Sequence, residues 1–146
     1  MIKFSRNKSI FSTFTNNDTF SDRLLIFLFH FAFFLKKFKT NVPKDKLQDV
    51  FDYIFKELEI SIREIGYGDA SINKKMKTYV NSLYSILEKI ENWDNLKNDD
   101  KNLILKSFFN YEGDLKKLID YFDKYSIFLQ KKSFNSFLNS VINLKI

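Results

Sequence analysis

His30 is the only histidine of the chain, and the chain contains no cysteine. An imidazole can act as a general acid or base, and it can bind iron or zinc. A Ser-His-Asp or Cys-His catalytic group would have to converge on this one side chain. His30 stands inside the apolar run from Leu24 to Leu35, which favours a buried, hydrogen-bonded histidine over a metal or haem ligand.

Carboxylates are the other candidates for acid–base or metal chemistry. A di-iron site in a helical bundle requires two Glu-x-x-His pairs, which a single histidine cannot provide. Gly66 and Gly68 lack the third glycine and the preceding strand of a dinucleotide-binding loop. We therefore predict no enzymatic activity, no metal site and no cofactor. The acidic residues of segment 47–65 are interpreted as a solvent-exposed face: Asp49, Asp52, Glu57, Glu59 and Glu64.

The formal net charge of +6 suits an anionic partner such as nucleic acid, a ribosome or an acidic membrane surface. Nearly all basic residues are lysines, the exceptions being Arg6, Arg23 and Arg63, and lysine commonly serves only to solvate a surface. We therefore predict no specific nucleic-acid site. The lysines of the central region form two groups: Lys36, Lys37, Lys39, Lys44 and Lys46 around one predicted loop, and Lys74, Lys75 and Lys77 early in a later helix.

The apolar run is expected to be the central helix of the fold. Residues 1–17 precede it, contain no acidic residue, and are predicted to form a flexible basic arm. Twelve helical residues span about 18 Å, short of the roughly 30 Å hydrocarbon core of a bilayer. A helix that is apolar on every side belongs in a core, but a small domain can hardly cover all of it. We therefore predict a partner-binding face on this helix that includes Phe27, His30 and Phe34.

Two long helices are then predicted from apolar residues spaced three and four apart. The first stripe runs from Leu47 to Ile65, and the second runs from Ile72 to Ile90. Polar and turn residues mark their ends: Asn41 as a cap near Pro43 in the first turn, Gly66 as the terminator, and Asp69 or Ser71 as the cap of the second helix.

Shorter helices are expected at 98–109, 114–129 and 134–142, with Gly113 breaking the chain between the first two. No segment alternates apolar and polar residues as a strand does. The sequence therefore predicts an all-α fold, a single-domain bundle of about six helices over residues 18–146.

One stretch of the sequence resembles a known family. Residues 51–69 read FDYIFKELEISIREIGYGD, and KKMK follows at 74–77. This is similar to the ubiquinol-cytochrome c chaperone family, whose members share a pattern close to F-D-x-x-F-x-(D/E)-(M/L)-(D/E)-x-x-(L/I)-R-E-x-G-x-G-D, followed by a basic helix. The resemblance covers about residues 19–130. Where the family commonly has A-F-Y-G-R, this chain has SLYSI at 82–86 and keeps only Tyr84.

The resemblance implies a non-enzymatic assembly chaperone for ubiquinol-cytochrome c reductase, respiratory complex III. It implies binding of newly made cytochrome b, with the ribosome and a small helical co-chaperone as further partners. It also implies peripheral contact with the inner membrane, on the cytoplasmic face in a bacterium or the matrix side in a mitochondrion. The partner-binding residues expected beyond the central helix are Gly66, Gly68, Asp69, Lys74, Lys75, Lys77 and Tyr84, while Arg63, Glu64 and Pro43 are assigned structural roles.

Two other functions fit the residues. A peripheral membrane module would dock its Leu24–Leu35 helix into lipid while lysines meet anionic headgroups. A ribosome- or RNA-associated adaptor would bind with an affinity that falls steeply with salt. Near the end of the first long helix, a buried Arg63 paired with a carboxylate such as Asp69 is a structural alternative to a functional Arg63–Glu64 pair.

Overall fold

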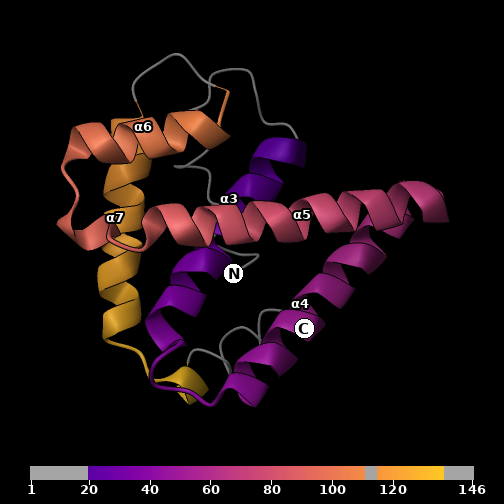
Figure 1. The fold of residues 1–146 in the computed structure, drawn as a ribbon, viewed down its shortest axis with the longest axis horizontal. Helices are drawn as coiled ribbons and strands as arrows, with labels where there is room; N and C mark the ends of the chain where they lie inside the picture. Colours follow the sequence, from indigo (N-terminus) through magenta and orange to yellow (C-terminus); the bar gives the residue numbers. More distant parts are fainter. Residues whose placement is uncertain (1–19, 111–114, 137–146) are drawn as a thin grey trace.

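Helices make up the whole regular structure of the residues described by the computed structural model, 20–110 and 115–136. The predicted all-α bundle is therefore confirmed (Figure 1). The predicted arm 1–17, the Gly113 break and most of the last predicted helix lie outside the described residues. The elements are α3 (Phe20–Phe38), α4 (Lys44–Ile65), α5 (Asp69–Ile90), the short 3₁₀-helix η1 (Trp93–Asn95), α6 (Asn98–Phe108) and α7 (Lys116–Gln130).

Helix α3 is the centre of the core, as its all-round apolar sequence predicts. Ile26, Phe29, Phe31 and Ala32 are fully buried, and Leu28, Phe33 and Phe34 are nearly so. Helices α5 and α7 both pack against α3, and Figure 1 shows α5 crossing it. Because most of its apolar side chains are buried in the protein, α3 does not expose the apolar face that the Leu24–Leu35 membrane module would place in lipid.

Aromatic rings of α3 pack against rings of α4, η1, α6 and α7. The Phe29 ring centroid lies 5.6 Å from that of Phe109 and 5.5 Å from that of Phe122 on α7. The Phe31 ring contacts two rings of α4, those of Phe51 and Phe55. Aromatic pairs in these offset and tilted arrangements add to the free energy of area burial, by about 0.5–1.5 kcal/mol each. Phenylalanines thus supply much of the core in the part of the chain that the structure describes.

The helix ends differ in detail from the sequence-based expectation. Pro43 takes the N-cap position of α4 with φ −55° and ψ 143°, and no side chain caps the helix, so Asn41 is not its cap. Helix α5 begins at Asp69 itself, with Gly68 in the N-cap position and again no side-chain cap. Neither Asp69 nor Ser71 caps α5. Both residues lie inside the helix, because α5 begins earlier in the chain than the sequence predicted.

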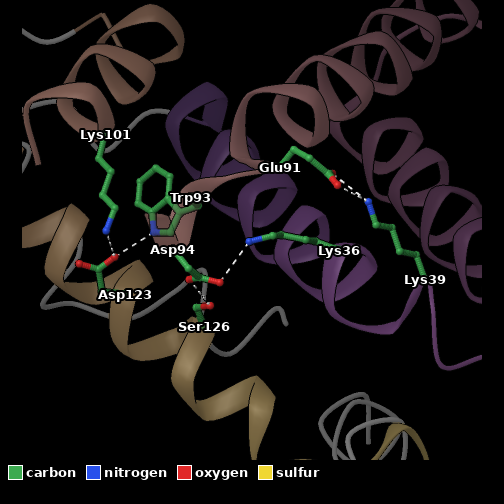
Figure 2. Close-up of polar contacts among 8 residues, drawn as sticks. All are labelled: Lys36, Lys39, Glu91, Trp93, Asp94, Lys101, Asp123 and Ser126. Atoms are coloured by element: carbon green, nitrogen blue, oxygen red, sulfur yellow. Dashed lines mark hydrogen bonds and ion pairs between the residues drawn. The ribbon is translucent and has the colours of Figure 1, made fainter. Parts of the chain in front are cut away.

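A set of polar contacts ties η1 to the helices around it (Figure 2). The indole Nε1 of Trp93 donates to Asp123 Oδ1 at 2.9 Å, and Lys101 Nζ donates to the same oxygen at 2.9 Å. The neighbouring Asp94 accepts from Lys36 Nζ at 3.3 Å and from Ser126 Oγ at 3.1 Å. These contacts join α3, α6 and α7 through η1, which lies between two of the helices predicted from the sequence.

None of the helices in the described part of the chain is long and apolar enough to cross a membrane.

Candidate partner-binding surface

The turn between α4 and α5 holds Gly66, Gly68 and Asp69, three of the residues predicted to bind a partner. Gly66 ends α4 in the left-handed conformation, with φ 106° and ψ 14°, and its N–H donates to the carbonyl of Arg63 at 3.0 Å. Gly68 then enters α5 with an extended backbone, φ −76° and ψ 163°. Figure 1 shows this turn at the end of the molecule where α4 and α5 meet, away from α6 and α7.

Arg63 bridges the two helices at this turn. Its guanidinium donates to Glu59 Oε1 at 3.0 Å and to Asp69 Oδ1, so one side chain joins α4 to the first residue of α5. These hydrogen bonds raise the pKa of Arg63 above its usual value. The predicted Arg63–Asp69 pair is therefore present, but both side chains are exposed instead of buried. Glu64, the adjacent residue, is also exposed.

Two apolar side chains stand exposed beside this pair. Ile65 is 54% exposed and Tyr67 is 42% exposed. The Lys75 ammonium lies 4.5 Å from the centroid of the Tyr67 ring, which holds that ring against α5. The apolar spacing predicted that Ile65 faces the core. That placement is wrong because α4 and α5 extend beyond α3 at this end, so no core residue lies over the last turn (Figure 1).

The outward face of α5 continues the same surface. Lys74, Lys77 and Tyr84 are exposed, and their spacing of three and seven residues places them along one side of the helix. Tyr84 is 57% exposed, and its ring stacks on that of Phe51 with centroids 6.3 Å apart. We define the junction surface by the exposed or half-buried residues Ile65, Gly66, Tyr67, Gly68, Asp69, Lys74, Lys75, Lys77 and Tyr84.

The residues of α3 that were predicted to bind a partner do not belong to the junction surface. His30 and Phe34 are buried in the core and Phe27 is half-buried, so α3 presents no open binding face. The side chains of His30 and Phe34 therefore offer no exposed surface to a partner. The expectation of an exposed α3 face is corrected because α4, α5, α6 and α7 together cover more of the apolar helix than a domain of this size was expected to cover.

His30 has the structural role favoured by its apolar surroundings. Its Nδ1 donates to the carbonyl of Ile26 at 2.7 Å, and its Nε2 accepts from the Tyr121 hydroxyl at 2.6 Å. Burial lowers the pKa of His30 to about 3, so the imidazole is neutral at pH 7. Both ring nitrogens are thus engaged by protein groups. Among the residues that the structure describes, no cluster of three or more potential metal ligands occurs.

A cavity of about 490 Å³ lies at the end of α3, next to α7 and η1. Lys36, Lys37, Asp94 and Ser126 contribute polar groups to its wall. The Asp94 carboxylate already accepts from Lys36 and Ser126, and neither a second carboxylate nor the imidazole lines this cavity. The charged groups of Lys36 and Asp94 are thus paired with each other at the wall of this cavity.

The two glycines of the turn provide a matched test of its geometry. Gly66→Ala is expected to lower the free energy of unfolding by about 1–2 kcal/mol, because an L-residue is strained in the left-handed region. Gly68→Ala should have a smaller effect, because its φ of −76° suits any residue. An added Cβ would meet no atom within 4 Å at either position, so the comparison isolates the backbone. Urea denaturation measures both changes; equal losses would contradict the assigned conformation.

Comparison with protein families supports the resemblance noted for residues 51–69 and 74–77. A family profile described as ubiquinol-cytochrome C chaperone matches residues 12–103, which include all of α3, α4, α5 and η1. The matched span ends within α6, short of the 130 expected from the sequence. No curated protein and no solved structure matches the chain. Because the profile covers more than half of the chain, this protein belongs to the ubiquinol-cytochrome c chaperone family.

Proposed function

We propose that the chain is a non-enzymatic assembly chaperone of ubiquinol-cytochrome c reductase that binds newly made cytochrome b through the junction surface. The observation that carries this proposal is the family match over residues 12–103, which contains the whole junction surface. The chemistry of that surface supports it independently, through side chains that suit an unassembled membrane protein.

The junction surface offers both apolar and cationic groups. Ile65 and Tyr67 expose apolar area at one end of the bundle, and Tyr84 exposes its ring farther along α5. Exposed apolar patches commonly mark interaction sites. Lys74 and Lys77 stand among them and suit acidic or phosphate groups of a partner. An unassembled membrane protein presents the matching features, namely apolar helices that end in polar, charged loops.

The turn is built to hold these groups in place. Arg63 joins α4 to α5 through Glu59 and Asp69, and the Gly66 conformation fixes the angle at which the two helices meet. A surface held by such contacts loses less conformational entropy when it binds. Contact of the protein with the inner membrane, and association with a ribosome or a small helical co-chaperone, are further parts of the proposed function.

Cytochrome b capture tests this function. Tagged protein is purified in mild detergent from its host, and the cytochrome b that remains bound is quantified by immunoblot. Lys74→Glu/Lys75→Glu is expected to reduce the captured cytochrome b by about tenfold or more, as loss of about 1.4 kcal/mol of binding free energy would do. Far-ultraviolet circular dichroism should show an unchanged helical spectrum, because Lys74 is exposed and Lys75 is half-buried.

The chain offers matched controls for this experiment. Lys44→Glu/Lys46→Glu makes the same change of charge at exposed positions on the first turn of α4, and should leave capture near the wild-type level. Wild-type capture of cytochrome b followed by equal loss in both variants would show that net charge, and not the junction surface, is responsible. Absence of cytochrome b from the wild-type preparation would contradict the proposed client.

A further inference from the structure

The outward side of α7 carries lysines together with exposed apolar side chains. Figure 1 shows α7 at the edge of the fold opposite the junction of α4 and α5. At 100° per residue, the exposed residues of this helix and of the position after it, Gln130 excepted, fall within an arc of about 120°. We call these residues the α7 outer face: Lys116, Lys117, Asp120, Lys124, Ile127, Phe128 and Lys131.

Positive charge dominates the α7 outer face. Lys117, Lys124 and Lys131 recur every seven residues, which places them in one row along the helix. Asp120 is the acidic residue of this face. The other aspartate of α7, Asp123, turns toward η1, where it accepts from Trp93 and from the buried Lys101 (Figure 2). The inward pairing of Asp123 leaves the outer face strongly cationic.

Apolar side chains interrupt this row of lysines. Ile127 is 53% exposed and Phe128 is 37% exposed, and both lie between Lys124 and Lys131. The Lys132 ammonium lies 5.3 Å from the centroid of the Phe128 ring, so the ring and the cation share one spot. A helix that presents lysines together with Ile and Phe has the composition of a segment that lies at the surface of a bilayer.

We infer that the α7 outer face docks on a lipid bilayer that contains anionic headgroups. Lysine side chains attract such headgroups while their aliphatic stems remain along the apolar boundary. Ile127 and Phe128 would enter that boundary, whereas base stacking on a single-stranded nucleic acid would use the Phe128 ring but not the aliphatic side chain of Ile127. Residues 115–136 contain no arginine, the residue most suited to bidentate phosphate recognition in nucleic acids.

This inference identifies which surface contacts the membrane and which class of lipid it binds. It rests on the membrane contact in the proposed function and not on the binding of cytochrome b. Helix α7 lies beyond residue 103, so the family match does not include it. The test contains no cytochrome b, and its failure would therefore leave the proposed client binding untouched.

Vesicle co-sedimentation of the full chain tests the inference. The probes are vesicles of phosphatidylcholine alone and of phosphatidylcholine mixed with phosphatidylglycerol, at low ionic strength. We expect binding to the mixed vesicles only. Lys117→Gln/Lys124→Gln/Lys131→Gln should weaken that binding on the order of 100-fold, given the attraction that each lysine near an anionic surface contributes. At high salt, the lysine attraction is screened and the remaining vesicle binding depends on apolar contact. Ile127→Ser/Phe128→Ser should weaken this remaining binding, and the triple lysine variant should leave it largely unchanged.

A matched variant separates this surface from net charge. Lys44→Gln/Lys46→Gln/Lys56→Gln removes three exposed lysines from α4 and should retain most of the vesicle binding. Equal weakening in both triple variants would overturn the inference, as would a wild-type chain that ignores anionic vesicles. Binding of single-stranded RNA that depends on the same three α7 lysines, without binding to vesicles, would also overturn it in favour of a nucleic-acid surface.

Discussion

Lowering the pH from 7 to 4 is expected to destabilise the fold by about 3 kcal/mol through His30 alone. Burial lowers the pKa of this imidazole from 6.5 to about 3. Between these values the unfolded chain binds a proton that the folded chain does not, so the free energy of unfolding falls as the pH falls. This loss of unfolding free energy through His30 is absent above about pH 6.5 and complete below about pH 3.

The hydrogen bonds of His30 explain why protonation is unfavourable. The neutral ring donates from Nδ1 to Ile26 and accepts at Nε2 from Tyr121. A proton on Nε2 would turn this acceptor into a donor, and the Tyr121 hydroxyl would have to rotate. The positive charge would also lie among apolar side chains that cannot solvate it.

The measurement is urea denaturation of the wild type and of His30→Gln at a series of pH values. The glutamine amide can donate and accept but does not titrate, so the variant is expected to lose the steep dependence between pH 6 and 4. Other groups titrate equally in both proteins; Glu91, whose pKa is lowered by its hydrogen bonds from Lys39, is one of them. Parallel stability curves for the two proteins would contradict the assignment to His30.

Trp93→Ala is expected to lower the free energy of unfolding by about 3–5 kcal/mol, the usual loss when a buried tryptophan is truncated. The indole is fully buried and its ring meets that of Phe33 edge to face, with centroids 5.4 Å apart. It also donates to Asp123, the residue that holds the buried Lys101. The change therefore opens a cavity and removes one donor from a partly buried carboxylate.

Thermal denaturation followed by circular dichroism measures this loss, which corresponds to a fall of about 10–20 °C in Tm. Trp93→Phe serves as the control, because it keeps an aromatic ring in the core and removes only part of the volume and the hydrogen bond. Its loss should be smaller than that of Trp93→Ala. A loss below about 1 kcal/mol in the alanine variant would show that η1 does not contribute to the core as described.

The sequence alone was sufficient for the helices whose apolar residues repeat at helical spacing. The stripe from Leu47 to Ile65 predicted α4, and the structure buries Ile54, Phe55 and Ile62 from it. The segment around Phe29 is apolar on every side, and it predicted the central helix because such a helix is buried only at the centre of a core. Local periodicity carries this information without knowledge of the neighbours.

Features that depend on neighbouring elements were not predictable in this way. Ile65 belongs to the apolar stripe by spacing, but it is exposed because α4 extends past the core. Trp93 lies in a polar segment, and only the approach of α6 and α7 supplies its partners Lys101 and Asp123. Whether an apolar residue is buried at a helix end depends on what packs over it, which spacing cannot show.

The candidate site was predicted in part from its motif. The motif in 51–69 indicated the Gly66 turn and the lysines after it, and the structure brings these residues together with the exposed Tyr67. The contribution of α3 to the site was not predicted correctly, since the burial of His30 and Phe34 depends on four other helices. The exposed row on α7 has no counterpart in the motif, because it lies beyond the matched residues.

The reduced-minus-oxidised spectrum of membranes from a host that lacks this chain is the most direct test of the proposed function. A chaperone of the cytochrome b of complex III should be required for that subunit to accumulate. The account predicts selective loss of the haem b signal of complex III, with the other cytochromes retained, and recovery when the wild-type chain is restored. An unchanged haem b signal in the deletion strain would contradict the proposal that this protein assists assembly of the reductase.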